Sequence, residues 1–280
     1  MCYMNNNKFP ILFIGHGSPM NLIEKNPWTE NWKLMTQLVL EKTGRKPKAI
    51  LMLSAHWYTR GTFLQVDEQP GMIFDMYGFP KPIYELDYPV KTSATLIHRV
   101  QELLGAEVTL QANRGYDHGA YAPLLKMFPE ADIPVVQLSI NGVQDAKYWF
   151  ETGQKLAPLC EEDILIIGSG DIVHNLRTLN PHMMNDGTVA VKAFEKRILE
   201  LLHTTDAADG IKGLLNWRAI EGAMDAAESP DHLAPLFYCL GAALGIGLEE
   251  GKSLKMPSVN VWNGDFVMGS LSMTSLAWGL

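Results

Sequence analysis

Short, continuous apolar runs limit what this chain can fold into. They are rich in Ile, Val and Leu, and several are apolar at consecutive rather than alternate positions. Such a run is typical of a strand that is covered on both faces. The runs are ILFIG (11–15), AILMLSA (49–55), VTLQA (108–112), PVVQLSI (134–140) and ILIIGSG (164–170).

Segments with the three-to-four spacing of amphipathic helices lie between these runs. They cover 28–44, 92–105, 145–160 and 187–203, and the first two end at a glycine. Strands that alternate with helices predict an α/β sandwich whose central sheet is mainly parallel and flanked by helices. No repeat or low-complexity linker divides the chain, so we expect one catalytic domain over residues 1–280.

The same pattern predicts where a ligand would bind. In open α/β sheets, ligands lie beyond the carboxyl ends of the strands, and we expect the active site there. The region 59–90 is rich in Gly and Pro, and we expect it to be irregular, with at most an added hairpin.

Composition excludes several classes of partner. The net charge is −8, and no run of Lys or Arg exceeds two residues, which argues against binding to nucleic acid or to an anionic membrane surface. No apolar stretch reaches the ~20 residues that cross a bilayer. The stretch 233–248, interrupted by Pro235 and three glycines, is better explained as a buried helix. We expect a cytoplasmic protein with three reduced thiols, Cys2, Cys160 and Cys239.

Five of the eight histidines lie in loop or cap contexts: His16, His56, His118, His174 and His232. His16 stands between two glycines, where the backbone comes close to a ligand without a Cβ in the way. For His232 we expect Ser229 as a helix N-cap and Pro230 in the first helical position. Each histidine taken singly is explained as a hydrogen-bonded polar residue. Together they predict a mononuclear metal site, because neutral imidazole is the commonest metal ligand near neutral pH.

These residues stand in motifs that resemble those of the class III extradiol ring-cleavage dioxygenases, in the DOPA 4,5-dioxygenase-like branch. The motifs run from residue 13 to the C-terminus: FIGHGSPM, LSAHWYT, YDHGAYAPL, SGDIVHNL, SPDHLAPLFYCLGA and GDFVMGSLSMTSLAWG. The resemblance implies an enzyme that opens the ring of a small catechol such as DOPA by 4,5-extradiol cleavage, with O₂ as the second substrate.

The resemblance also implies roles for the histidines. His16 and His56 would be metal ligands, and His232 would be the third, where the wider class has a glutamate. His174 would be the acid–base residue and would lie close enough to contact the metal, and His118 would lie near the substrate oxygens. Fe(II) is expected for activity, with Zn(II) as an alternative occupant, because three neutral ligands suit zinc as well.

Other residues in these motifs have two interpretations each. The aromatic rings of Trp57, Tyr116 and Tyr121 either stack on a planar substrate or pack in the wall of the site. Asp117 and Asp171 either orient imidazoles as hydrogen-bond acceptors or cap turns and helices.

The sequence leaves two other classes of function open. The first is a zinc-dependent hydrolase on the same fold, because an all-histidine site can lower the pKa of bound water. The second is a binding protein without catalysis. The oligomeric state, monomer or homodimer, also stays open.

Overall fold

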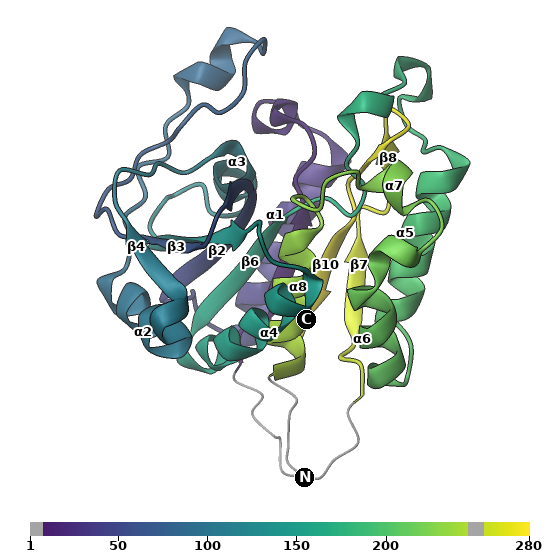
Figure 1. Cartoon of the computed structure of the whole chain (residues 1–280). Coiled ribbons are helices and arrows are strands. Elements are labelled where there is room, and N and C mark those ends of the chain that lie inside the picture. The colour runs from purple at the N-terminus through teal and green to yellow at the C-terminus, as the bar shows by residue number, and fades with distance from the viewer. Residues whose placement is uncertain (1–7, 246–254) are drawn as a thin grey trace.

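A computed structural model describes residues 8–245 and 255–280. Within these ranges, a central eight-stranded sheet has the order β4-β3-β5-β2-β6-β1-β10-β7 (Figure 1). A short hairpin of β8 (Phe266–Val267) and β9 (Leu271–Ser272) stands apart from it. The strands of the sheet are β1 (Ile11–Gly15), β2 (Ala49–Thr59), β3 (Thr62–Gln65), β4 (Val108–Gln111), β5 (Val135–Asn141), β6 (Ile164–Gly170), β7 (Val259–Trp262) and β10 (Ser275–Trp278).

The middle of the sheet is parallel and its borders are mixed. The pairs β5–β2, β2–β6 and β6–β1 are parallel, whereas β10 runs antiparallel to both β1 and β7, and β3 runs antiparallel to β5. The predicted α/β fold with a mainly parallel sheet flanked by helices is confirmed. The five predicted strands correspond to β1, β2, β4, β5 and β6.

Capping residues mark the ends of the helices, as α1 illustrates. Asn26 caps α1 through a reciprocal capping box with Thr29, and Gly44 ends that helix in the left-handed conformation, with φ 66°. The helices are α1 (Pro27–Thr43), α2 (Ala94–Leu104), α3 (His118–Met127), α4 (Ala146–Leu156), α5 (Val189–Leu202), α6 (Ala207–Leu215), α7 (Ala223–Ala226) and α8 (Ala234–Gly245). The short 3₁₀ helices are η1 (Pro19–Leu22), η2 (Lys81–Glu85), η3 (Gly105–Glu107), η4 (Ala157–Glu162), η5 (Leu176–Thr178), η6 (Pro181–Met183) and η7 (Trp217–Ala219).

The central strands β1, β5 and β6 are buried on both faces, as their continuous apolar runs predict, whereas the edge strands β4 and β7 are partly exposed. In β1, Ile11 and Phe13 join the core that contains α2, α4, α5 and α8, whereas Leu12 and Ile14 join the core that contains α1 and α3. Figure 1 shows α4 and α8 on the near face and α1 on the far one. Successive side chains of a strand point to opposite faces, so a strand buried on both sides must be apolar throughout.

Two expectations need correction. The region after β2 adds no hairpin between neighbours in sequence, because β3 pairs with β4 and β5 instead of β2. Ser229 does not cap α8, which begins at Ala234 after a turn in which Ala234 N–H donates to the Pro230 carbonyl. The antiparallel strands β7 and β10 were not predicted. Cys160 and Cys239 are buried free thiols, whereas Cys2 and residues 246–248 of the predicted last helix lie outside the described residues.

Across the described ranges, no helix is both long and apolar enough to span a bilayer.

Candidate active site

The five predicted histidines come together at the carboxyl ends of the parallel strands. His16 directly follows β1, His56 lies near the end of β2, and His174 follows β6. Since β2, β6 and β1 are neighbours in the sheet, their ends deliver these side chains to one place. His118 begins α3, and His232 lies in the turn before α8.

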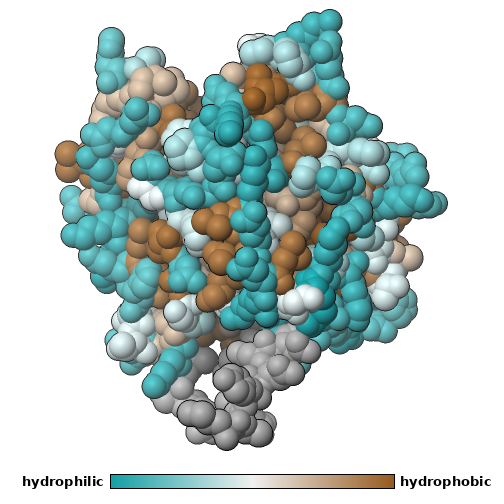
Figure 2. Space-filling model, turned by 180° about the vertical axis from the view of Figure 1, so that it is seen from behind, coloured by the Kyte–Doolittle hydropathy of each residue, from teal (hydrophilic) through white to brown (hydrophobic). Residues whose placement is uncertain are grey.

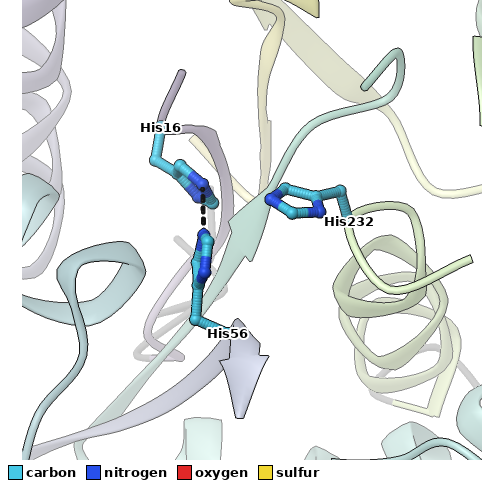
Figure 3. Close-up of side chains that lie close together, drawn as sticks. All are labelled: His16, His56 and His232. Atoms are coloured by element: carbon cyan, nitrogen blue, oxygen red, sulfur yellow. Dashed lines mark hydrogen bonds between the residues drawn. The ribbon is translucent and has the colours of Figure 1, made fainter. Parts of the chain in front are cut away.

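Three of these imidazoles converge. His16, His56 and His232 each offer a ring nitrogen, and these nitrogens all lie within 4.8 Å of one another. Figure 3 shows the three rings pointing toward a common space from β1, from β2 and from the turn before α8. The Nε2 atoms of His16 and His56 are 3.2 Å apart. Two nitrogens that are each about 2.1 Å from one ion are separated by a similar distance.

Hydrogen bonds at the other ring nitrogen leave the Nε2 atoms of His16 and His232 with lone pairs. Ser169 donates its hydroxyl proton to the Gly119 carbonyl, so it must accept from His16 Nδ1–H, at 3.0 Å. His232 Nδ1–H donates to Asp231 Oδ2, at 2.6 Å. The buried Nε2 of His232 has no hydrogen-bond partner among the described residues. Ring nitrogens fixed in this way are typical of metal ligands, and the donor set fits a divalent ion.

The electrostatics of the site also favour neutral rings. Burial, together with the neighbouring imidazoles, lowers the pKa of His16 and of His56 well below the ordinary value. Burial acts against ionisation of Asp231, but the hydrogen bond and electrostatic attraction from His232, together with a hydrogen bond from Ser229, outweigh it and lower the pKa of that carboxyl. A carboxylate against a metal-binding imidazole holds the ring in one tautomer and increases its basicity.

The remaining two histidines lie on either side of this cluster. His174 stacks on His232, with ring centroids 3.5 Å apart and an interplanar angle of 4°. Burial and the adjacent His232 lower the pKa of His174 to about 2, so its ring is neutral. His118 lies beside His56, with ring centroids 3.9 Å apart, and its Nδ1–H donates to Asp75 Oδ1 at 2.9 Å.

Other sets of side chains are spaced closely enough to hold an ion as well. They are His56 with Asp75 and His118, and Asp171 with His174 and His232. His174 therefore groups with His232 and Asp171 rather than with His16 and His56. Its predicted contact with the metal stays a prediction.

The two aspartates predicted to orient imidazoles or to cap helices differ from each other. Asp117 caps α3 by accepting from Ala120 N–H, and it also accepts from Ser54 and Gln137 beneath the site. Asp171 caps no helix. It accepts from Gly17 N–H at 3.1 Å and lies 3.9 Å from His16 Nε2, and burial raises its pKa well above the ordinary value.

A cavity of about 830 Å³ opens above the histidines and is lined by all five. Figure 2 shows the top of the molecule hollowed between two projecting parts. The walls are largely apolar, and examples are Trp28, Met76, Phe79, Leu271 and Met273. An apolar cavity with a few convergent polar groups at its floor is typical of a site for a small ligand.

The structure does not bring Trp57, Tyr116 or Tyr121 into this cavity. Trp57 is buried outside it under the guanidinium of Arg114, 5.3 Å from its ring centroid. Tyr121 is fully buried, and its hydroxyl contacts the sulfur of Met76. Tyr116 packs in the core and donates to the Val135 carbonyl. Their predicted contact with substrate has no support in the structure, and the aromatic wall is built by Trp28 and Phe79 instead.

Sequence reasoning missed two side chains that contact the histidine cluster. Asp75 joins His118 and His56, whose Nδ1 is 3.4 Å from Asp75 Oδ2, yet it lies in the irregular region 59–90 without a motif. Asp231 was detectable, because it directly precedes His232.

The fold and the converging imidazoles define a metal-binding α/β enzyme that takes a small ligand at the ends of its strands. Residues 10–261 match the model of the family "Catalytic LigB subunit of aromatic ring-opening dioxygenase". The chain belongs to this family of metal-dependent enzymes and is an extradiol ring-cleavage dioxygenase, which confirms the resemblance seen in its sequence.

Similar proteins that align over nearly the whole chain support this family assignment. The chain is 39% identical over 278 residues to "4,5-DOPA dioxygenase extradiol" of Escherichia coli (strain K12), covering 99% of this chain and 97% of that protein. It is 35% identical to the protein of the same name from Beta vulgaris, covering 94% and 96%. The crystal structure of an uncharacterized Escherichia coli K12 protein aligns with a TM-score of 0.78 at 35% identity, covering 97% of this chain and all of that one.

Proposed function

We propose that this enzyme cleaves the ring of DOPA by 4,5-extradiol cleavage, with Fe(II) held by His16, His56 and His232. The convergence of these three imidazoles at the floor of one cavity carries the proposal. The names of the relatives support DOPA as the catechol. The ion, when bound, would bring the catechol and O₂ together and pass electron density between them.

The chain's own side chains would handle the protons. His174 lines the cavity and stacks on His232, which places its ring where it can accept a proton from a phenolic oxygen of the bound diol. His118 has its Nδ1 engaged by Asp75, which leaves Nε2 for a hydrogen bond to the oxygens of the ligand. The apolar walls would exclude water from the reacting ring.

We further propose that residues 1–280 act as one catalytic domain. The supporting observation is that β1 pairs with β10, so the first strand and the last strand lie side by side in the same sheet.

Metal reconstitution tests the proposal. Protein loaded anaerobically with Fe(II) and then mixed with DOPA and oxygen should form a yellow ring-opened product, whose mass shows the gain of both oxygen atoms. Zn(II)-loaded protein is the matched control and should form none. Fe(II)-loaded protein that opens neither DOPA nor any catechol in a panel would contradict the proposal. Ester or amide hydrolysis with iron and oxygen excluded would favour the zinc hydrolase instead.

A further inference from the structure

One ion pair stands at the mouth of the cavity, beside the stacked histidines. Arg177 is three residues after His174, and Glu228 is four residues before His232. The Arg177 guanidinium pairs with the Glu228 carboxylate, and both side chains line the cavity. Three residues of chain span at most ~10 Å, so this pair lies near the site of chemistry.

The charges around the cavity make this arginine unusual. Among the described residues that line the cavity, Arg177 is the one Arg or Lys, against four carboxylates: Glu24, Asp75, Glu228 and Asp231. Asp75 and Asp231 are engaged by His118 and His232. Glu24 and the Arg177–Glu228 pair are therefore the charged groups left to meet a ligand.

The backbone that carries Arg177 is firmly held. The buried side chain of Asn175 accepts from Arg177 N–H at 3.1 Å and donates to the Asp225 carbonyl at 2.9 Å. Asn175 N–H donates to the Ser270 carbonyl, and the Ser270 hydroxyl donates to the Asn175 carbonyl. The side chain of Arg177 is nevertheless 79% exposed and that of Glu228 is 40% exposed. A fixed backbone with accessible charged tips suits ligand binding, whereas an ion pair this exposed adds little stability.

We infer that Arg177 and Glu228 form a subsite for the zwitterionic α-amino acid group of a catechol amino acid. This inference rests on the proposed function, because the diol must sit at the histidines for its tail to reach the pair. Arg177 would bind the carboxylate through the fork of its guanidinium, and Glu228 would bind the ammonium. The ligand would thus replace one ion pair by two of the same kind, with no charge left over.

The subsite makes a definite prediction about specificity. The cavity's excess of carboxylates alone would favour a cationic catecholamine. The paired subsite instead favours a zwitterion over a catechol with only an ammonium or only a carboxylate. Holding the diol, the carboxylate and the ammonium at once also distinguishes the two enantiomers of the amino acid.

Four catechols with different tails test the inference: L-DOPA, dopamine, 3,4-dihydroxyphenylpropionate and 4-methylcatechol. For Fe(II)-loaded Arg177→Ala, the KM for L-DOPA and for the propionate, relative to that for 4-methylcatechol, should rise about tenfold. For Glu228→Gln, the relative KM should rise for L-DOPA and dopamine. Both variants should lose discrimination between L- and D-DOPA.

Three control measurements accompany these variants. Arg197→Ala breaks an exposed arginine–glutamate pair on α5, outside the cavity, and should leave all three KM ratios to 4-methylcatechol as in the wild type. Glu24→Gln tests whether Glu24, rather than Glu228, binds the ammonium group of the ligand. Anaerobic titration of the Zn(II)-loaded protein with each of the four catechols gives Kd values without turnover. In each variant these Kd values should change in the same way as the KM values.

The outcomes separate this inference from the proposed function. Wild-type protein that opens 4-methylcatechol but not DOPA overturns DOPA as substrate, while the propionate still tests Arg177. The subsite is overturned if the KM ratios to 4-methylcatechol stay unchanged in Arg177→Ala. It is also overturned if this variant raises the KM of all four substrates equally. If Glu24→Gln rather than Glu228→Gln shifts the ratio for dopamine, the assignment of Glu228 is wrong.

Discussion

His174 and His232 lie in parallel planes with their ring centroids 3.5 Å apart, and only His232 groups with His16 and His56. Under the proposed function, this stack would place a metal ligand against a proton acceptor. We predict that His174→Ala retains the metal and loses about 10²–10⁴-fold in kcat, the range that general acid–base catalysis contributes. His16→Ala should lose the metal itself. Metal analysis of the dialysed variants checks this, and equal occupancy in the two would contradict the division of roles.

Asp75 joins the segment after β3 to two histidines, since it accepts from both Nδ1 and the backbone N–H of His118 and lies against His56. Burial opposes its ionisation, but the hydrogen bonds and the electrostatic attraction from His118 together outweigh this and lower the pKa of Asp75. Asp75→Asn should therefore cost about 10–100-fold in metal affinity or activity. Asp87→Asn, an exposed change in the same segment, is the control. Equal behaviour of the two variants in metal titrations and rate measurements would refute a positioning role for Asp75.

Gly119 stands in the first turn of α3, where an added Cβ would lie 2.7 Å from the His56 ring and would also overlap the Ser54 hydroxyl. Alanine would favour a helix by about 0.5–1 kcal/mol over glycine. We nevertheless predict that Gly119→Ala binds metal more weakly, because its methyl group displaces His56.

Gly44→Ala is the control for Gly119→Ala. Gly44 has φ 66° and nothing within 4 Å of its Cβ position, so its substitution should cost about 1–2 kcal/mol of stability and leave metal affinity unchanged. Thermal unfolding and metal titration separate the two effects. Wild-type metal affinity in Gly119→Ala would show that His56 has room to move.

Glu195 is a buried carboxyl on α5 that accepts from Thr274, while its other oxygen has no hydrogen-bond partner among the described residues. Burial raises the pKa of Glu195 from 4.5 to about 7. Between these values the folded protein holds a proton that the unfolded chain has released. The free energy of unfolding therefore falls as pH rises through this interval, by about 3 kcal/mol, and levels off above it.

Glu195→Gln should remove this loss of stability. The free energy of unfolding of the variant, relative to that of the wild type, should therefore rise by about 3 kcal/mol between pH 4.5 and pH 7. Urea unfolding across that range measures the gain. Glu200→Gln, an exposed change on the same helix, should follow the wild type. A constant difference between Glu195→Gln and the wild type would contradict the raised pKa.

The sequence predicts the sheet and the histidines well because both depend on local pattern. Continuous apolar runs identify the strands, and a histidine after such a strand must lie at its carboxyl end. The turn before α8 was harder, because Ser229 and Pro230 are good starting residues but the helix begins only at Ala234. Asp75 and the orientation of Trp57 depend on tertiary contacts between distant segments, which no local pattern carries.

The central claim is that one ion is held by His16, His56 and His232. Anomalous scattering at the iron absorption edge, from crystals of Fe(II)-loaded protein, tests it most directly. We predict a single peak about 2.0–2.2 Å from a ring nitrogen of each of these three residues. A peak held instead by His56, Asp75 and His118, or no peak in this cavity, would contradict the account.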